Sequence, residues 1–257
     1  MKRVHLFEFE DQPWFPSVVR DGMTDYLKFV SNRFDFYKSV VPILVRGLEK
    51  SSEKKIVDLA SGAGGGWLKL AEHLIQTFPK LRIVLTDRFP NHHAFSEVVK
   101  TNPEVFEFMS EPVDARQVPT KLKGLRTQFL SLHHFKPIDA KKILQNAVDA
   151  GQPIAIFEAQ KRDLSHIIKF AMSPIAVVLL TPLIRPFKWN RLILTYLIPV
   201  IPLFTLWDGL VSVLRTYSLK ELEQMTCMLR GSDSFNWEIG ESNSDLVTVT
   251  YLLGYPS

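Results

Sequence analysis

Apolar residues recur with two different periods between residues 55 and 158 of this 257-residue chain. Short apolar runs bounded by polar residues predict β-strands. In the stretches between them apolar residues recur every three to four positions, which predicts α-helices. Alternating strands and helices are typical of a parallel sheet covered by helices on both faces. The strands predicted on this basis are Ile56–Asp58, Lys80–Asp87, Phe106–Met109, Leu125–Leu132 and Pro153–Phe157.

Residues 1–50 precede this core and are predicted to form a helical cap. The segment Phe9–Pro16 is aromatic and contains prolines, so we expect a loop. After it, apolar residues at three-to-four spacing predict two helices, Asp25–Phe36 and Tyr37–Leu48.

Residues 218–257 are predicted to complete the sheet. A helix over Ser218–Leu229 begins with a capping box, because Ser218 is followed three residues later by Glu221. Two strands, Phe235–Ile239 and Asp245–Leu253, are then expected to pair antiparallel across a turn at residues 240–244. The fold class is therefore α/β, a single domain with a mostly parallel sheet of seven strands.

Residues 159–217 form an insertion that differs from the rest of the chain. It holds two runs without a charged residue, Phe170–Ile184 and Leu192–Trp207, each interrupted by two prolines. A helix that spans a bilayer needs about 20 apolar residues. Both runs are shorter, so we do not expect a pair of transmembrane helices.

The basic character of the chain comes from this insertion. The whole chain has a formal charge of +4, whereas the insertion alone carries seven Lys and Arg and two Asp, which gives +5. Nucleic acid is not an expected partner, because long aliphatic runs replace the aromatic-interleaved basic stripe that would bind it. Two interpretations stay open. The runs form a lid over an apolar acceptor pocket, which we favour, or they contact an anionic membrane through Arg185, Lys188 and Arg191.

Composition limits the compartment and the redox chemistry. Cys227 is the only cysteine, so a disulfide framework is excluded, and we expect this side chain to pack as a small apolar group. The first residues carry three acids and no apolar signal region. We therefore expect a cytoplasmic protein, with possible peripheral binding at the inner face of a membrane.

A glycine-rich loop directly follows the first predicted strand. The strand ends at Asp58, and four of residues 62–66 are glycine before an amphipathic helix begins at Trp67. Such a loop lets the backbone approach a nucleotide closely. The dinucleotide pattern G-x-G-x-x-G fits poorly, because Trp67 stands in one register and Ala60 in the other. Asp58 would also repel a pyrophosphate but would attract an ammonium group.

The sequence VDLASGAG, residues 57–64, resembles the first motif of the class I S-adenosylmethionine-dependent methyltransferases. This resemblance covers roughly residues 55–160 and the C-terminal strands, and it implies a Rossmann-like fold and S-adenosylmethionine as cofactor. It also implies that the loop wraps the methionine part of the cofactor. Asp87 would bind the ribose, by the same logic that places an acid after a dinucleotide loop, and Asp114 the adenine. The cofactor-binding residues expected from it are Asp58, Ala60, Ser61, Gly62, Gly64, Asp87, Arg88, Asp114, Ala115 and Ser131.

Three residues are candidates for acting on the acceptor. His133 and His134 follow the fourth predicted strand and Glu158 ends the fifth, on the side of the sheet where ligands bind. Histidine titrates near neutral pH and can remove a proton from a hydroxyl nucleophile. His92 and His93 are expected to be surface residues. No group of His, Cys, Asp and Glu has metal-ligand spacing, so no metal is expected.

The predicted function is methyl transfer from S-adenosylmethionine to a small acceptor, lipophilic or lipid-like in view of the insertion. One alternative is a protein on the same fold that binds the cofactor or docks on a membrane without catalysis. A nicotinamide-dependent dehydrogenase is disfavoured by Asp58 and Trp67. The sequence indicates neither the acceptor atom nor the oligomeric state.

Overall fold

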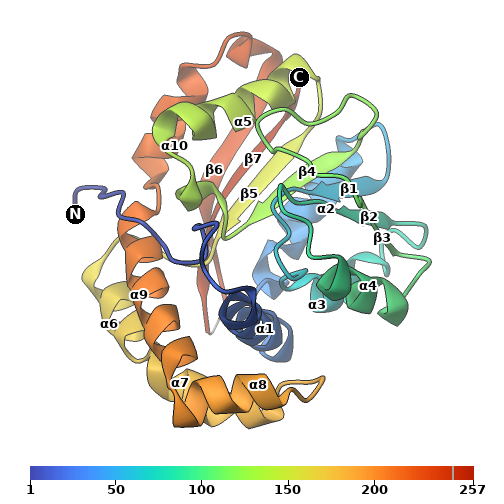
Figure 1. Ribbon diagram of the computed structural model, residues 1–257. Helices are drawn as coiled ribbons and strands as arrows, with labels where there is room; N and C mark the ends of the chain where they lie inside the picture. The colour runs from blue at the N-terminus through green and yellow to red at the C-terminus, as the bar shows by residue number, and fades with distance from the viewer. Residues whose placement is uncertain (245) are drawn as a thin grey trace.

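The computed structural model describes residues 1–244 and 246–257. Its centre is a seven-stranded sheet of order β3-β2-β1-β4-β5-β7-β6, in which β1 to β5 are parallel and β7 is antiparallel to both its neighbours (Figure 1). The predicted fold class is confirmed. The strands are β1 (Lys55–Asp58), β2 (Arg82–Leu85), β3 (Phe106–Phe108), β4 (Leu125–Phe129), β5 (Ile154–Glu158), β6 (Phe235–Asn243) and β7 (Thr248–Pro256).

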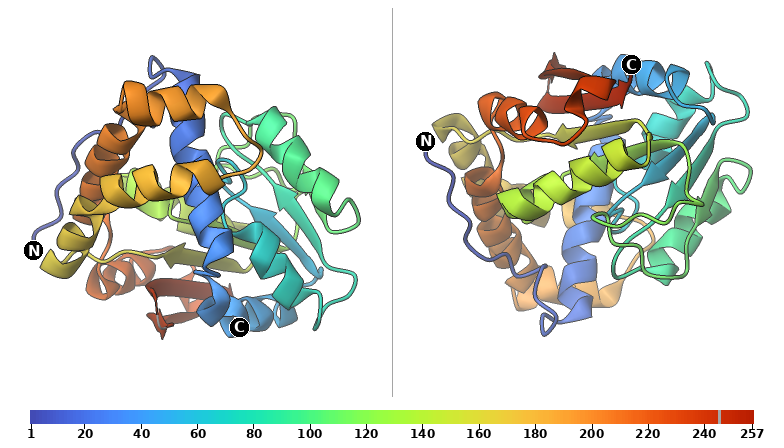
Figure 2. Two further views of the ribbon diagram at one scale, coloured as in Figure 1. Left: turned by 90° about the horizontal axis from the view of Figure 1, so that it is seen from below. Right: turned by 90° about the horizontal axis from the view of Figure 1, so that it is seen from above.

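Helices cover both faces of the sheet (Figure 2). On one face lie α2 (Val41–Glu49), α3 (Trp67–Leu74) and α4 (His92–Thr101), and on the other lie α5 (Pro137–Asp149) and α10 (Leu219–Cys227). Successive residues of a strand point to opposite faces. Ile56 of β1 accordingly packs in the core under α2 and α3, and Val57 packs in the core under α5. β1 and β5 are thus mainly apolar and buried on both faces, as is typical of parallel sheets. β4, which lies between them, also buries the polar side chains of Arg126 and Gln128.

Several element boundaries differ from the prediction. The first helix, α1 (Ser17–Arg33), begins eight residues earlier than expected, and the second consists of a 3-10 turn, η1 (Lys38–Val40), followed by α2. The first C-terminal strand is longer than predicted, because backbone pairing continues to Asn243, and the second has the predicted length but is shifted by three residues, to Thr248–Pro256. The predicted start of the last strand, Asp245, lies outside the described residues.

Two local predictions for the C-terminal part have opposite outcomes. The capping box is present, since the Ser218 side chain accepts from the Glu221 N–H and the Glu221 carboxylate accepts from the Ser218 N–H. Cys227, in contrast, is exposed at the end of α10 rather than packed as an apolar group. It lies on the outer side of a helix whose inner side contributes Leu222 and Met225 to the core.

The insertion folds into a helical layer that packs on α1. Its elements are α6 (Leu164–Ala171), α7 (Ser173–Leu180), η3 (Thr181–Leu183), α8 (Trp189–Leu192), the π-helical turn η4 (Ile193–Leu197) and α9 (Val200–Arg215). Figure 2 shows α1 between these helices and the rest of the domain. Met23 and Tyr26 of α1 share a separate apolar cluster with Val177 and Ile201 of the insertion. The insertion is thus attached through its own small core.

The outer side of the insertion is apolar and exposed. The helical run Leu164–Leu183 has 20 residues and a mean hydropathy of 1.7, and 17% of its most apolar window is buried. In length and composition this run could cross a membrane. It is longer than the uncharged run Phe170–Ile184, because the helical segment already begins at Leu164. A second apolar helix pair, Trp189–Leu197 and Val200–Arg215, is bent by 79°.

Two of the three basic residues named in the membrane interpretation bind α1. Arg191 is 3% exposed, and its guanidinium binds the Asp25 carboxylate of α1 at 2.6 Å. Lys188 binds the same carboxylate at 2.7 Å. Only Arg185 of the three residues is exposed and, within the part of the chain that the structure describes, outside any ion pair. In the membrane interpretation these three charges would face head groups, whereas Lys188 and Arg191 join the insertion to α1.

Candidate functional site

The glycine-rich loop lies at the carboxyl ends of β1 and β2. Gly62, Gly64 and Gly65 have φ angles of +56°, +90° and +40°, a region that favours glycine. A Cβ atom on Gly62 would meet no atom within 4 Å, so the loop is open on the ligand side at this position. Ala60 also has a positive φ, +59°, although it has a side chain.

Asp58 lies at the tip of β1, beneath this loop. Its carboxylate is buried and accepts a hydrogen bond from the Thr127 hydroxyl at 2.7 Å. Burial raises the pKa of Asp58 to about 6, against the lowering effect of its hydrogen bonds. Ser61, also buried, donates its hydroxyl hydrogen to the Asp58 carbonyl at 3.0 Å. This makes Ser61 a residue that shapes the turn.

Asp87 follows β2 and faces the loop, as predicted. Its carboxylate accepts from the Gly62 N–H at 3.0 Å and from the Phe89 N–H at 2.8 Å. Burial raises the pKa of Asp87, and the backbone hydrogen bonds oppose the shift. Arg88, another predicted cofactor residue, is exposed and stacks on Phe89. The loop and the second acid are therefore adjacent, and Arg88 points to solvent.

The remaining predicted cofactor residues are farther along the same edge. Asp114 makes an ion pair with Arg116 at 2.6 Å, which lowers the pKa of the Asp114 carboxyl. Ala115 is buried beside it. Ser131 is buried after β4, and its hydroxyl has no hydrogen-bond partner among residues 1–244 and 246–257. Such a hydroxyl is available to a ligand.

His133 and Glu158 form a buried pair at the ends of β4 and β5. Nδ1 of His133 lies 2.8 Å from one Glu158 oxygen, and the His133 backbone N–H donates to the other at 3.1 Å. A carboxylate only accepts, so Nδ1 carries the hydrogen, and in the neutral ring Nε2 has a lone pair, with the Gln160 amide nitrogen 3.5 Å away. Two of the three predicted acceptor-side residues are therefore in direct contact.

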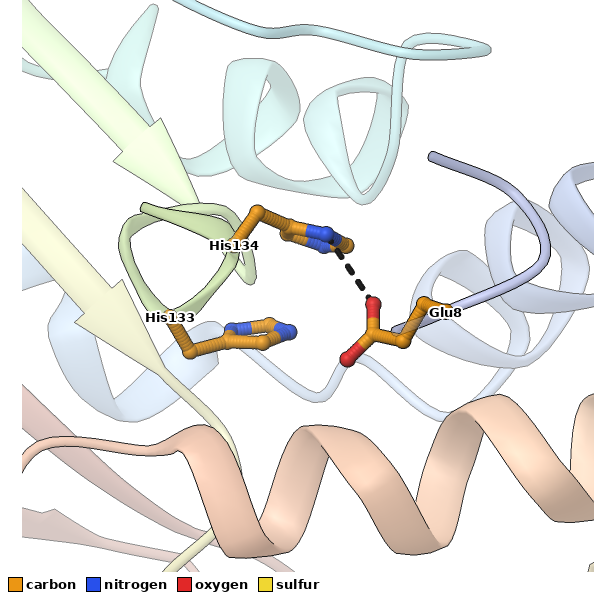
Figure 3. A group of neighbouring side chains, drawn as sticks. All are labelled: Glu8, His133 and His134. Atoms are coloured by element: carbon orange, nitrogen blue, oxygen red, sulfur yellow. Dashed lines mark ion pairs between the residues drawn. The ribbon is translucent and has the colours of Figure 1, made fainter. Parts of the chain in front are cut away.

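His134 is held by acids from the N-terminal segment, residues 1–16. Its Nδ1 lies 2.8 Å from Asp11 and 3.0 Å from Glu8, and its Nε2 lies 3.6 Å from Glu10. Burial alone would lower the pKa of His134, but the charges of Glu8 and Asp11 outweigh it and hold the pKa well above its ordinary range. Figure 3 shows both histidine rings and the Glu8 carboxylate directed toward one another.

Comparison with known proteins places the fold. No protein-family model and no curated protein matches the sequence. Among solved structures, the plantazolicin methyltransferase BpumL in complex with SAH has 13% identity and a TM-score of 0.55, over 97% of this chain and 93% of that one. Magnesium protoporphyrin IX methyltransferase from Synechocystis, with bound SAM, has 11% identity and a TM-score of 0.51, over 99% and 100%.

An O-methyltransferase family 2 protein from Planctomyces limnophilus, in complex with apigenin, has 13% identity and a TM-score of 0.54, over 93% of this chain and 62% of that one. This chain thus spans less than two thirds of that protein. Identities this low establish a shared fold. The chain has the class I S-adenosylmethionine-dependent methyltransferase fold.

Within this methyltransferase fold, sequence reasoning missed the N-terminal acids and their partners on α9. Arg215 binds Glu8 at 3.2 Å and Asp11 at 2.7 Å, and the Asp208 carboxylate accepts from the Phe9 N–H at 2.7 Å. Asp208 and Arg215 are seven residues apart in an otherwise uncharged helix, so they lie on one helical face. This spacing of two charges on one face of α9 was the sequence signal that could have indicated a charged contact there.

Proposed function

We propose that this chain transfers a methyl group from S-adenosylmethionine to a small acceptor. The observation that carries the proposal is the placement of Asp58 and Asp87 around an open glycine loop at the ends of adjacent strands. The loop would hold the methionine part of the cofactor, and Asp87 the ribose hydroxyls. A carboxylate buried at Asp58 disfavours a dinucleotide, because it would repel a pyrophosphate. The shared fold supports the same cofactor.

Calorimetric titration tests this proposal directly. Purified protein is titrated with S-adenosylmethionine, S-adenosylhomocysteine and NAD under one set of conditions. We expect one site for each of the first two ligands and no binding of NAD. Binding of NAD alone would replace the proposal with the dehydrogenase interpretation.

His133 is proposed to prepare the acceptor. S-adenosylmethionine supplies the electrophilic methyl group. A hydroxyl acceptor loses its proton to Nε2 of His133, and the Glu158 carboxylate stabilises the imidazolium that results. His134 does not suit this role, because the acids around it keep it protonated. Its contribution would be to position the N-terminal segment.

The His133→Ala variant separates this role from cofactor binding. For a hydroxyl acceptor we expect turnover to fall by about 10²–10⁴-fold. Affinity for S-adenosylmethionine, measured by calorimetry, should change little. Full turnover in this variant and in Glu158→Ala would mean that the protein works by alignment alone.

The exposed face of the insertion supports a lipophilic acceptor taken from a membrane surface. Large apolar side chains recur at three-to-four spacing along α6, α7 and η3, each more than half exposed: Leu164, Ile168, Met172, Ile175, Leu179 and Leu183. Contiguous exposed apolar side chains of this kind mark interaction sites. We therefore propose peripheral binding at the cytoplasmic face of a membrane through this apolar stripe. Since most insertion cations are paired internally, apolar burial rather than charge would drive binding.

Co-sedimentation with vesicles tests the membrane contact. We expect the protein to bind neutral and anionic vesicles, with weak dependence on salt. The double variant Leu179→Asp and Leu183→Asp should stay in the supernatant. Ile138→Asp is a matched control, because Ile138 of α5 is as exposed as Leu179, at 68%, yet lies on another helix. No sedimentation at low salt, or loss in the control as well, would refute the contact.

The alternative of a non-catalytic protein is tested with an undirected assay. Protein and labelled S-adenosylmethionine are incubated with a lipid extract and, separately, with a polar extract of host cells. We expect a labelled product in the lipid fraction. Binding of the cofactor with no product in either fraction would favour the non-catalytic alternative.

A further inference from the structure

Three side chains from distant parts of the sequence offer ligand atoms to one point. These atoms, one each from Glu8, His133 and His134, lie within 4.8 Å of one another. Figure 3 shows the two stacked imidazoles on one side and the carboxylate facing them. We propose that these three residues bind a divalent transition-metal ion, with Zn²⁺ as the matching chemistry. Two imidazoles and one carboxylate are a ligand set that such ions favour over Mg²⁺ or Ca²⁺.

Two of the three atoms have a lone pair for an ion, and the third, Nδ1 of His134, would first lose its hydrogen. Nε2 of His133 has its lone pair, because the hydrogen sits on Nδ1 and is donated to Glu158. Glu8 is fully buried, and its Oε2 has no hydrogen-bond partner within the described residues. This oxygen is 3.0 Å from Nδ1 of His134, but that nitrogen is already hydrogen-bonded to Asp11 at 2.8 Å. The ion would replace the hydrogen on Nδ1 of His134, which the carboxylates of Glu8 and Asp11 both approach.

The surroundings of both imidazoles also match a metal centre. Metal-bound histidines usually donate the other ring N–H to a carboxylate or carbonyl. His133 donates to Glu158 from the nitrogen remote from the cluster. His134 has Glu10 at 3.6 Å from Nε2, the nitrogen that would be remote from the ion. Glu158 thus orients the His133 ring by a hydrogen bond, and Glu10 is the carboxylate near the remote nitrogen of His134.

The charge balance favours a cation at this point. Four carboxylates, those of Glu8, Glu10, Asp11 and Glu158, surround the two rings, and the Arg215 guanidinium pairs with two of them, Glu8 and Asp11. Burying excess negative charge is costly, so a divalent ion would stabilise the arrangement. It would also link the N-terminal segment to the end of β4.

The ion and the acceptor's proton would compete for one lone pair. This consequence rests on the proposed function, in which Nε2 of His133 accepts that proton. The site would therefore inhibit methyl transfer when filled, and it would close the N-terminal segment over the end of the sheet. Metal binding itself can be measured without any acceptor.

The test uses full-length protein freed of metal with a chelator and titrated with Zn²⁺ by calorimetry. We expect one ion per chain, confirmed by elemental analysis after dialysis. Glu8→Gln should weaken binding about 100-fold or more, since it removes the charged ligand but can still accept the Ser212 hydrogen bond. His134→Gln is the second ligand variant, and circular dichroism establishes that both are folded. His93→Gln, an exposed histidine on α4, is the control and should bind as the wild type does.

Three results would overturn the site: no binding at 100-fold excess Zn²⁺, unchanged affinity in the folded Glu8→Gln and His134→Gln proteins, or equal loss in His93→Gln. Titration of the same samples with S-adenosylmethionine keeps the two proposals apart. Zinc binding without cofactor binding would remove the proposed function and leave the metal site. Cofactor binding without zinc binding would remove the metal site and leave the proposed function.

Discussion

Asp58 combines a buried carboxylate with a position directly beneath the glycine loop. Burial raises its pKa to about 6, so the group is protonated below that pH and charged above it. If the charged form attracts the ammonium group of the cofactor, affinity for S-adenosylmethionine should fall as pH drops through 6. Between pH 7.5 and pH 5 we expect about a tenfold loss. Calorimetry over this range measures it.

The Asp58→Asn variant is the control for this pH dependence. It should bind S-adenosylmethionine weakly at every pH, because the amide stays neutral. A wild-type affinity that is flat between pH 5 and 7.5 would show that Asp58 does not meet the cofactor's charge.

Asp87 allows a second test at the level of one residue. Its carboxylate is oriented by two backbone N–H groups, and the proposal assigns it to the ribose hydroxyls. Asp87→Ala should weaken S-adenosylmethionine binding by roughly 1.5–3 kcal/mol, the range for hydrogen bonds to a charged group. Asp149→Ala, an exposed acid on α5, is the control. Equal affinity in the two variants would contradict the assignment.

At the scale of elements, the two glycines of the loop differ in their surroundings. Gly62 faces open space, whereas a Cβ on Gly64 would lie 2.8 Å from the Val98 side chain. Both have positive φ, which costs about 1–2 kcal/mol for a residue with a side chain. Gly62→Val should therefore abolish cofactor binding with a small loss of stability. Gly64→Val should do the same with a larger loss, because Val98 must also move.

Thermal unfolding together with calorimetry checks this pair of variants. The sequence alone predicts the same result at both positions, and the difference comes from the packing of α4. Normal cofactor affinity in both folded variants would remove the loop from the binding site.

Elements were predictable where local pattern and burial agree. β1 and β5 were predicted because their buried residues are mostly apolar and the two strands end at acids, Asp58 and Glu158. β4 was predicted although it buries the polar side chains of Arg126 and Gln128. The start of α1 was missed, because residues 17–24 contain charges and their apolar side is explained only by the insertion that covers it. The residues of the site also divide into those that a local pattern predicts and those that only the folded chain brings together. Glu8 meets His134 only through the folded arrangement of distant segments, which spacing in the sequence does not reveal.

At the scale of the whole molecule, the insertion and α1 form a second core, and ion pairs as well as apolar contacts hold its two parts together. Asp25 of α1 accepts from both Arg191 and Lys188. Arg191 also donates to the carbonyls of Ile184 and Pro186 at 2.8 Å, which holds the loop between η3 and α8. Its role is therefore internal, although its sequence context suggested contact with head groups.

Arg191→Met and Lys188→Met separate these roles on the same carboxylate. Removing buried Arg191 leaves two carbonyls without a donor, so we expect a loss of roughly 3 kcal/mol in the free energy of unfolding. Lys188 is more exposed, and its loss should cost less than about 1 kcal/mol. Chemical denaturation measures both values. Vesicle binding of the two folded proteins should match the wild type, since neither side chain lies on the apolar stripe. If both variants lost little stability and Arg191→Met bound anionic vesicles more weakly than the wild type, Arg191 would contact lipid head groups after all.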